Sequence, residues 1–229
     1  MKTTDHFSRR RLLGLGAATA AGGVLLASGL TTPAQAAAAA KPQRSRRWNK
    51  SITQNGWPVL EKAALHHIEG SNLTVRLADG DAATILLYVA QRYLYEVDAE
   101  VPGNEITGHT TERTVTTAFE SNSLSGTALT IRPLHYPVGA KDGFFPQQQL
   151  VIRDILADLE GVVRWGSDLK PVKESHFQLD VPPGDTRMKK VAAKLTRWDH
   201  MAGQGAGSID AFTPQRRQAA RKLEAQQQA

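Results

Sequence analysis

Residues 121–133 read Ser121-Asn122-Ser123-Leu124-Ser125-Gly126-Thr127-Ala128-Leu129-Thr130-Ile131-Arg132-Pro133. The serine-rich first half indicates a tight polar turn. Gly126 permits a close backbone approach that other residues resist. The apolar and β-branched residues that follow are typical of a strand. The stretch therefore predicts a turn that leads into a short strand over residues 129–133.

The rest of the chain mixes helical and extended patterns. Apolar residues recur at helical spacing after Asp81, after Pro146 and after Asp185, whereas residues 176–181 alternate in polarity. The predicted helices cover residues 82–95, 146–160 and 186–197, and the predicted strands cover residues 73–77, 129–133, 162–165 and 176–181. We expect an α+β fold in which a small, mostly antiparallel sheet is flanked by helices.

The composition excludes several classes of function. The chain has 229 residues, no cysteine and a formal net charge of +6. The absence of cysteine excludes disulfides, thiolate metal ligands and a cysteine nucleophile. The basic excess lies at the two ends, because residues 51–193 contain 13 basic and 18 acidic side chains, a net charge of −5. A folded domain without a basic surplus argues against nucleic acid as a partner.

The first 36 residues have the pattern of an export signal. Ser8-Arg9-Arg10-Arg11 precedes a mildly apolar run rich in Gly and Ala, and Ala34-Gln35-Ala36 matches a cleavage site. The pattern predicts a twin-arginine (Tat) signal peptide at residues 1–36, with the Tat translocase as a partner during export. We expect a secreted, extracytoplasmic protein without a stable membrane span after cleavage. A membrane-spanning anchor is the alternative.

Both flanks of the domain differ from it in composition. Residues 37–50 are basic and predict a flexible linker, which is either a solvated tether or a segment attracted to anionic wall polymers or a membrane surface. The folded domain is expected to begin near Trp48 or Trp57 and is assigned to residues 51–197. Residues 198–229 are rich in Gly, Gln and Ala and predict a flexible C-terminal tail.

Four short motifs occur in order within residues 75–195. They are Ser125-Gly126-Thr127-Ala128, Tyr136-Pro137, Val163-Arg164-Trp165-Gly166 and Glu174-Ser175-His176-Phe177-Gln178. Together they resemble the zinc D-alanyl-D-alanine carboxypeptidases, whose motif S-x-H-x-x-G-x-A-x-D is matched by residues 121–130 except at two positions. The resemblance implies a Hedgehog/DD-peptidase-like fold with a cleft for peptidoglycan.

The two unmatched positions are those that would bind metal. The resemblance implies that active members hold zinc with two His and one Asp, and that a carboxylate near the last His acts as general base toward zinc-bound water. Here Ser123 and Thr130 replace one His and the Asp, and a hydroxyl is a poor zinc ligand. Only His176 matches. Lys173 stands where an acid is expected, so Glu174 becomes the candidate catalytic base if the preceding loop bends.

Three interpretations stay open. We favour a catalytically inactive homologue that binds peptidoglycan peptide or glycan and needs no cofactor. The second is an active zinc metallopeptidase with rearranged ligands, in which His109 or His135 joins His176 and a carboxylate. The third is a structural secreted protein whose cleft has no ligand. For the favoured interpretation the cleft would be lined by Ser121, Asn122, Ser123, Thr130, Arg132, Trp165 and His176.

Two of these cleft residues have alternative roles. Ser123 beside His176 would begin an acyl-transfer site, although no acidic residue to orient the imidazole is obvious and no G-x-S-x-G turn is present. Arg132 would either bind the terminal carboxylate of a peptide stem or form a structural salt bridge.

Overall fold

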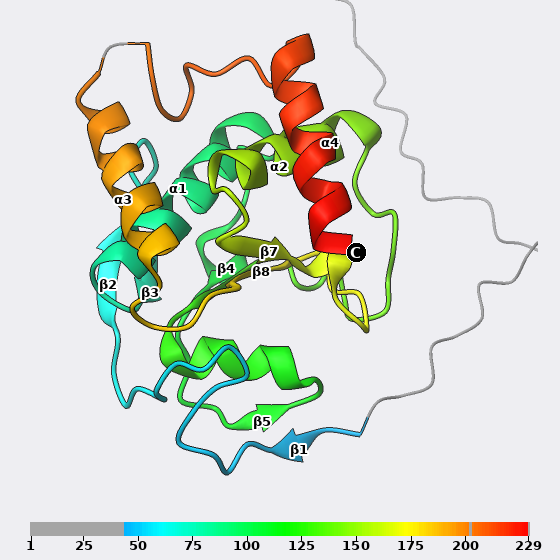
Figure 1. Cartoon of the computed structure of the whole chain (residues 1–229). Coiled ribbons are helices and arrows are strands. Elements are labelled where there is room, and N and C mark those ends of the chain that lie inside the picture. Colours follow the sequence, from blue (N-terminus) through cyan, green and yellow to red (C-terminus); the bar gives the residue numbers. More distant parts are fainter. Residues whose placement is uncertain (1–43, 202, 229) are drawn as a thin grey trace, which may run out of the picture. The chain divides into compact units, whose positions relative to one another are not determined.

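The computed structural model describes residues 44–201 and 203–228, so the predicted export signal at residues 1–36 lies outside the described residues. The fold is α+β. Its centre is a four-stranded antiparallel sheet with the strand order β4-β6-β8-β7 (Figure 1). The strands are β4 (Ile106–Thr107), β6 (Ala128–Ile131), β8 (His176–Leu179) and β7 (Val163–Trp165).

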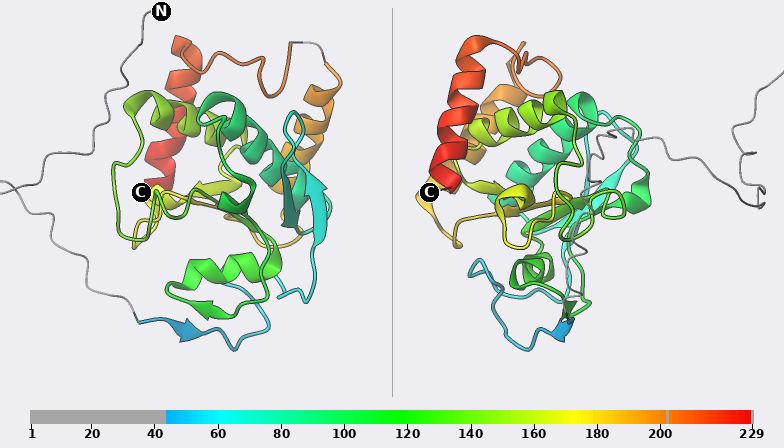
Figure 2. Two further views of the ribbon diagram at one scale, coloured as in Figure 1. Left: turned by 180° about the vertical axis from the view of Figure 1, so that it is seen from behind. Right: turned by 90° about the vertical axis from the view of Figure 1, so that its right-hand side faces the viewer.

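The α-helices form a layer on one side of this sheet, as the views in Figure 2 show. α1 (Asp81–Glu96) and α2 (Pro146–Asp158) pack on the sheet, α3 (Thr186–Asp199) packs on α1, and α4 (Pro214–Gln228) packs on α2. No helix within residues 44–201 and 203–228 combines the length and the apolar character needed to cross a membrane.

Short elements complete the fold. The 3-10 helix η2 (Ala118–Ser125) lies on the sheet face opposite the α-helices, next to β5 (Thr114–Val115) and its antiparallel partner β1 (Arg46–Arg47). A second antiparallel pair lies beside α1. The other short elements are β2 (Ala64–His67), β3 (Thr74–Leu77), η1 (Gly103–Glu105) and η3 (Gly166–Asp168).

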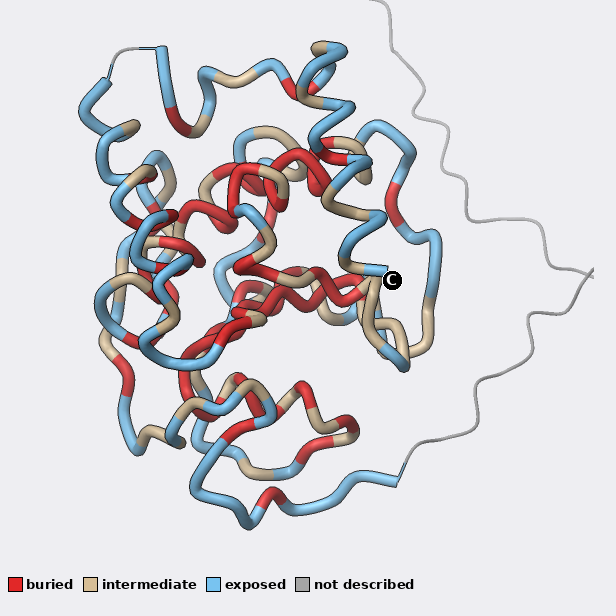
Figure 3. Tube along the Cα trace, in the orientation of Figure 1, coloured by how far each residue is buried: buried red, intermediate tan, exposed pale blue. Residues whose placement is uncertain are grey.

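Alternate residues of the central strands belong to different layers. Leu129 of β6 and Phe177 of β8 belong to the large hydrophobic core, together with α1 and α2. Successive side chains of a strand point to opposite faces, so Thr130 and His176 lie on the face that η2 covers. Figure 3 shows both strands buried along their length, because layers cover both faces of the sheet.

The predicted helices and strands are confirmed, with shifts of one or two residues at their ends. The strand predicted over residues 129–133 stops at Ile131 for a local reason. Arg132 takes a positive φ of 56°, and Pro133 has no N–H to donate to a neighbouring strand.

The basic linker is shorter than predicted. The expectation of a flexible segment over residues 37–50 is wrong for its last part, because Arg46–Arg47 forms β1 and Trp48 is buried against Val115 and Leu124. The backbone N–H of Trp48 also donates to the carbonyl oxygen of Arg113 at 2.7 Å. Ordered structure therefore precedes residue 51.

The expectation of a flexible tail over residues 198–229 is also wrong, because residues 214–228 form α4. Pro214 opens the helix, where a missing N–H costs nothing, and the Gln, Ala and Arg residues that follow are good helix formers. Ala220 is buried against the domain and Leu223 packs on the core. A segment with tail-like composition is thus a docked helix.

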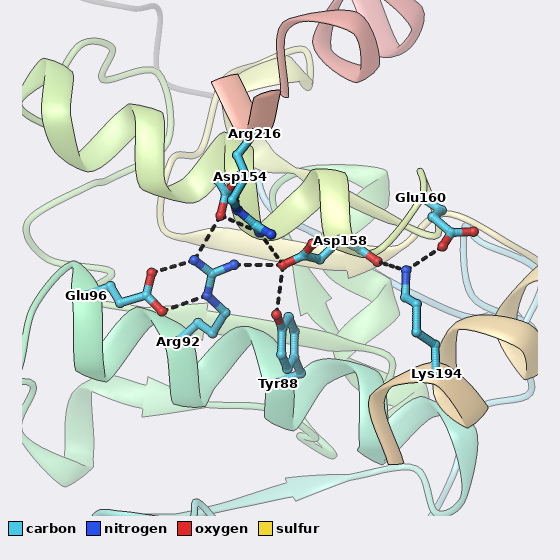
Figure 4. A network of polar contacts seen from close by, with 8 residues as sticks. All are labelled: Tyr88, Arg92, Glu96, Asp154, Asp158, Glu160, Lys194 and Arg216. Atoms are coloured by element: carbon cyan, nitrogen blue, oxygen red, sulfur yellow. Dashed lines mark hydrogen bonds and ion pairs between the residues drawn. The ribbon is translucent and has the colours of Figure 1, made fainter. Parts of the chain in front are cut away.

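Buried charges hold α4 to the domain (Figure 4). Arg216 of α4 donates from Nε to Asp154 at 2.7 Å and from Nη2 to Asp158 at 2.7 Å, and both carboxylates belong to α2. Arg92 of α1 is fully buried and contacts the same two carboxylates at 2.9 Å each, as well as Glu96. One network therefore joins α1, α2 and α4.

Candidate functional site

The turn that enters β6 is built around Gly126. This residue takes a left-handed conformation with φ 65° at the end of η2, and its carbonyl oxygen accepts from the backbone N–H of Ala78 at 2.9 Å. A Cβ atom at Gly126 would lie 2.6 Å from the backbone nitrogen of Ala78. The predicted close backbone approach is confirmed, and it fixes η2 against the chain that leaves β3.

β6 and β8 bring two of the predicted site residues together. Thr130 and His176 are direct partners in the antiparallel register. Both lie on the polar face of the sheet, under η2, and both are buried. These are the positions at which the resemblance places an aspartate and a histidine as metal ligands, so the strand pairing sets them side by side.

The imidazole of His176 makes a hydrogen bond and a ring contact within the protein. Its Nε2 is 3.0 Å from Oε1 of Gln178, and because that oxygen can only accept, Nε2 carries the proton. The ring also packs on Phe119 of η2, with 5.0 Å between the ring centroids. Burial, with the nearby charge of Lys173 as a second cause, lowers the pKa of His176 to about 4, so the ring is neutral at physiological pH.

Residues 54 and 55 cover two other predicted cleft residues, Ser121 and Asn122. Ser121 accepts from the backbone N–H of Gln54 at 2.9 Å, and Asn122 accepts from that of Asn55 at 3.0 Å. The Asn122 amide donates in turn to Gln54 at 3.1 Å and to Gln178 at 2.9 Å. Ser121 and Asn122 are fully buried. They hold the chain together and do not line an open cleft.

The sequence alone does not predict that residues 54 and 55 cover Ser121 and Asn122. Asn55 Nδ2 donates to Thr127 Oγ1 at 2.9 Å and to the carbonyl oxygen of Leu179 at 3.0 Å. These contacts join residues that are 72 and 124 positions apart in the chain. The only local signal is the polar turn at residues 53–56, which predicts a loop and names no partner.

Ser123 stands apart from these buried contacts. It is half-buried in η2, and its carbonyl oxygen accepts from the backbone N–H of Thr110 and of Gly126. Within residues 44–201 and 203–228, no hydrogen bond links its hydroxyl to His176. The Ser–His pair that acyl transfer requires is therefore not formed.

Glu174 is hydrogen-bonded to the loop that precedes α2. Its carboxylate is buried and accepts from the backbone N–H of Asp142 at 3.0 Å and of Gly143 at 2.9 Å. It thus anchors the loop before α2. Both carboxylate oxygens are engaged by that loop, and the role of Glu174 as catalytic base stays a prediction.

The charges of a lysine and a glutamate, Lys173 and Glu120, act on His176. Lys173 Nζ is 2.6 Å from Glu120 Oε1, and the other oxygen of Glu120 accepts from Thr116 and Thr117 at the start of η2. Burial on its own would raise the pKa of Glu120, but the hydrogen bond and charge of Lys173 outweigh it and hold that pKa below its usual range. The Glu120 carboxylate is therefore ionised at neutral pH.

Arg132 and Trp165 serve the fold. Arg132 Nε is 2.8 Å from Asp98, and its other nitrogens contact Glu105 and the carbonyl oxygen of Glu100. The salt-bridge alternative for Arg132 is the one observed. Trp165 is 1% exposed, and its Nε1 donates to the carbonyl oxygen of Glu174 at 2.7 Å. Neither side chain is free to receive a peptide or sugar as predicted.

The additional histidines do not complete a metal site. His109 Nε2 is 3.0 Å from the carbonyl oxygen of Leu60, and His135 is exposed beside Glu105. In the described part of the chain, no group of three His, Cys, Asp or Glu side chains lies close enough to hold a metal. The site offers an imidazole whose Nε2 is hydrogen-bonded, two hydroxyls and a carboxylate paired with an ammonium, and this donor set does not fit Zn²⁺.

Comparison of the chain with protein-family models, with curated proteins and with solved structures finds no match. The resemblance to the zinc carboxypeptidases therefore depends on the four short sequence motifs alone.

Proposed function

We propose that this protein is an exported, non-hydrolytic homologue of the zinc D-alanyl-D-alanine carboxypeptidases that binds peptidoglycan peptide or glycan. The observation that carries the proposal is the pairing of Thr130 with His176 across β6 and β8. The two positions that the resemblance assigns to metal ligands are paired, but one is a threonine and the imidazole Nε2 of the other is hydrogen-bonded to Gln178.

The non-hydrolytic part of the proposal follows from the chemistry that peptide-bond cleavage needs. A zinc peptidase requires three metal ligands and a base that reaches the attacking water. The pairing of Lys173 with Glu120 places an ammonium near the imidazole, where its charge opposes a divalent cation. Both nearby carboxylates are engaged within the protein, Glu174 by the loop before α2 and Glu120 by Lys173.

The binding part of the proposal concerns the edge of the site that stays open. The side chains of Lys173 and Glu120 are 15% and 17% exposed. Ser123 is half-buried and lies three residues after Glu120 on η2, so the two side chains project on the same side of the 3-10 helix. Peptide stems of peptidoglycan carry amines and carboxylates, which can exchange partners with such an ion pair.

Three measurements on the purified full chain test the proposal. The proposal expects no stoichiometric zinc, no release of D-alanine from stem peptides, and co-sedimentation with purified wall sacculi. Lys173→Gln should reduce co-sedimentation because it removes the ammonium from the open edge. Lys170→Gln is the matched control, since Lys170 is an exposed lysine in the same loop.

Two other results would support the competing interpretations. Stoichiometric zinc that is lost in His176→Ala, together with D-alanine release, would identify an active metallopeptidase with rearranged ligands. If the protein contains no zinc and does not associate with sacculi, the result would support a structural protein without a ligand at this site.

A further inference from the structure

A basic groove of about 670 Å³ lies on the η2 side of the molecule, apart from the site at His176. It is formed by β1, the loop that follows it and the first residue of η2. These elements lie in the lower part of Figure 2. The residues that matter for its chemistry are Arg46, Arg47, Trp48, Lys50, Gln54 and Ala118.

Trp48 positions two cations at this groove. Its ring is 7% exposed, and its Nε1 donates to the carbonyl oxygen of Ile52 at 3.1 Å. The guanidinium of Arg46 lies 5.9 Å from the ring centroid, and the ammonium of Lys50 lies 5.5 Å from it. Cation–π attraction thus holds both charges near the indole. A ring of a ligand cannot stack on an indole that is buried in this way.

The loop that carries these charges is held from β5. Arg113, the residue before β5, donates from Nη1 to the carbonyl oxygens of Trp48 and Lys50, both at 3.2 Å. The antiparallel pairing of β1 with β5 fixes Arg47 opposite Thr114. The cations therefore project from a backbone that is ordered before any ligand binds.

The charges of the groove are not neutralised by ion pairs. Over the described residues, no carboxylate lies within ion-pair distance of Arg46, Arg47 or Lys50, whereas the buried Arg92 contacts three. Glu112, two residues before β5, offsets part of the local charge. Three unpaired cations on one ordered segment create a positive potential that attracts anions.

We propose that this groove binds a linear polyanion through successive phosphate or carboxylate groups. Two arginines offer planar forks that suit such oxyanions, and the lysine adds a point charge. Recognition depends on charge, because Trp48 offers no stacking surface. That excludes the base stacking by which single-stranded nucleic acids are usually held and favours a polymer without bases.

The test measures binding of inorganic polyphosphate to the full chain over a series of NaCl concentrations. The variant Arg46→Gln/Arg47→Gln/Lys50→Gln should weaken binding at least tenfold. It should also reduce the slope of log K against log[NaCl] by about 2, since each cation–phosphate contact contributes roughly 0.7 to 0.9. The control variant Lys189→Gln/Lys190→Gln/Lys222→Gln removes the same charge from exposed sites on α3 and α4 and should change affinity less than twofold.

Parallel titrations identify the anion and the class of polymer. Polyphosphate binding tighter than poly-L-glutamate at equal charge assigns the groove to phosphate, and the reverse order assigns it to carboxylate. Equal losses in the two triple variants would overturn the proposal, because net charge alone would then explain binding. Tighter binding of oligothymidylate than of polyphosphate would also overturn it in favour of a nucleic-acid site.

The groove and the edge at Lys173 are separable. Lys173→Gln should leave polyphosphate binding unchanged, and the groove variant should keep the thermal unfolding of the parent, since Arg46, Arg47 and Lys50 are exposed. Failure of the groove proposal would therefore leave the proposal on peptidoglycan untouched, and the converse also holds.

Discussion

Replacing Arg216 by alanine should loosen α4 and destabilise the whole domain. The guanidinium makes three contacts of 2.7 to 2.8 Å with Asp154 and Asp158, whose side chains are 1% and 10% exposed. Together with Arg92 and Glu96, the buried group has two positive and three negative charges, and the substitution changes its net charge from −1 to −2.

The contacts that the two aspartates keep in Arg216→Ala determine how much stability is lost. Removing one partner of a buried ion pair costs roughly 3–5 kcal/mol. Both aspartates keep their contacts with Arg92 at 2.9 Å, and the Arg216 side chain is 27% exposed, so water can replace part of what is lost. We therefore expect a smaller loss of about 2–3 kcal/mol, at or just below the lower limit of that range.

The assay is equilibrium unfolding in urea, followed by far-UV circular dichroism. Arg216→Ala should lower the midpoint with little change in the slope, because the surface exposed on unfolding is nearly unchanged. Arg217→Ala is the control, since Arg217 is the exposed neighbour on the same helix and its removal should change stability by less than about 0.5 kcal/mol. Equal effects of the two substitutions would refute a role of the buried network in holding α4.

Three further predictions concern the site. The pKa of His176 is lower in the folded than in the unfolded protein, so unfolding takes up a proton as the pH falls, and about 3 kcal/mol of stability should be lost from pH 6.5 to pH 4. His176→Asn should flatten the pH dependence of the free energy of unfolding measured in urea. An unchanged pH dependence would contradict the burial argument. Gly126→Ala should cost at least about 2 kcal/mol of stability and Gly184→Ala only about 1. Both glycines have positive φ, but only at Gly126 would a new Cβ atom meet the backbone. Equal losses of stability in thermal unfolding would exclude the close contact as the cause. Asn55→Ala should cost about 2 kcal/mol because it removes the donor to Thr127 Oγ1 and to the buried carbonyl oxygen of Leu179, whereas the exposed Asn49→Ala should be neutral. A neutral Asn55→Ala would show that residues 54–55 do not hold the site closed.

Periodicity predicted the parts of the fold that depend on local sequence. The apolar spacing in residues 82–95 follows from a helix with one buried face, and the tight turn at Gly126 follows from the absence of a side chain. α4 was missed for a related reason. Gln, Ala and Arg are abundant both in flexible tails and in exposed helices, and only the partners of Arg216 and Ala220 distinguish the two.

The site was harder to predict because its contacts are distant in sequence. The resemblance indicated that Thr130 and His176 belong to one site, and the register of β6 with β8 pairs them. No local pattern indicates that Gln54 and Asn55 cover Asn122, or that Glu174 binds the loop before α2. The resemblance therefore implied an open cleft, whereas long-range hydrogen bonds bury Ser121 and Asn122.

The most direct test of the account is to introduce the two metal ligands that the resemblance expects at positions 123 and 130. Ser123→His/Thr130→Asp replaces both hydroxyls with the groups that the resemblance expects, beside the existing His176. If η2, β6 and β8 have the geometry of the zinc carboxypeptidases, the purified variant should bind about one zinc per chain, and the added substitution His176→Ala should abolish that binding. A folded double variant that binds no more zinc than the parent would contradict the account.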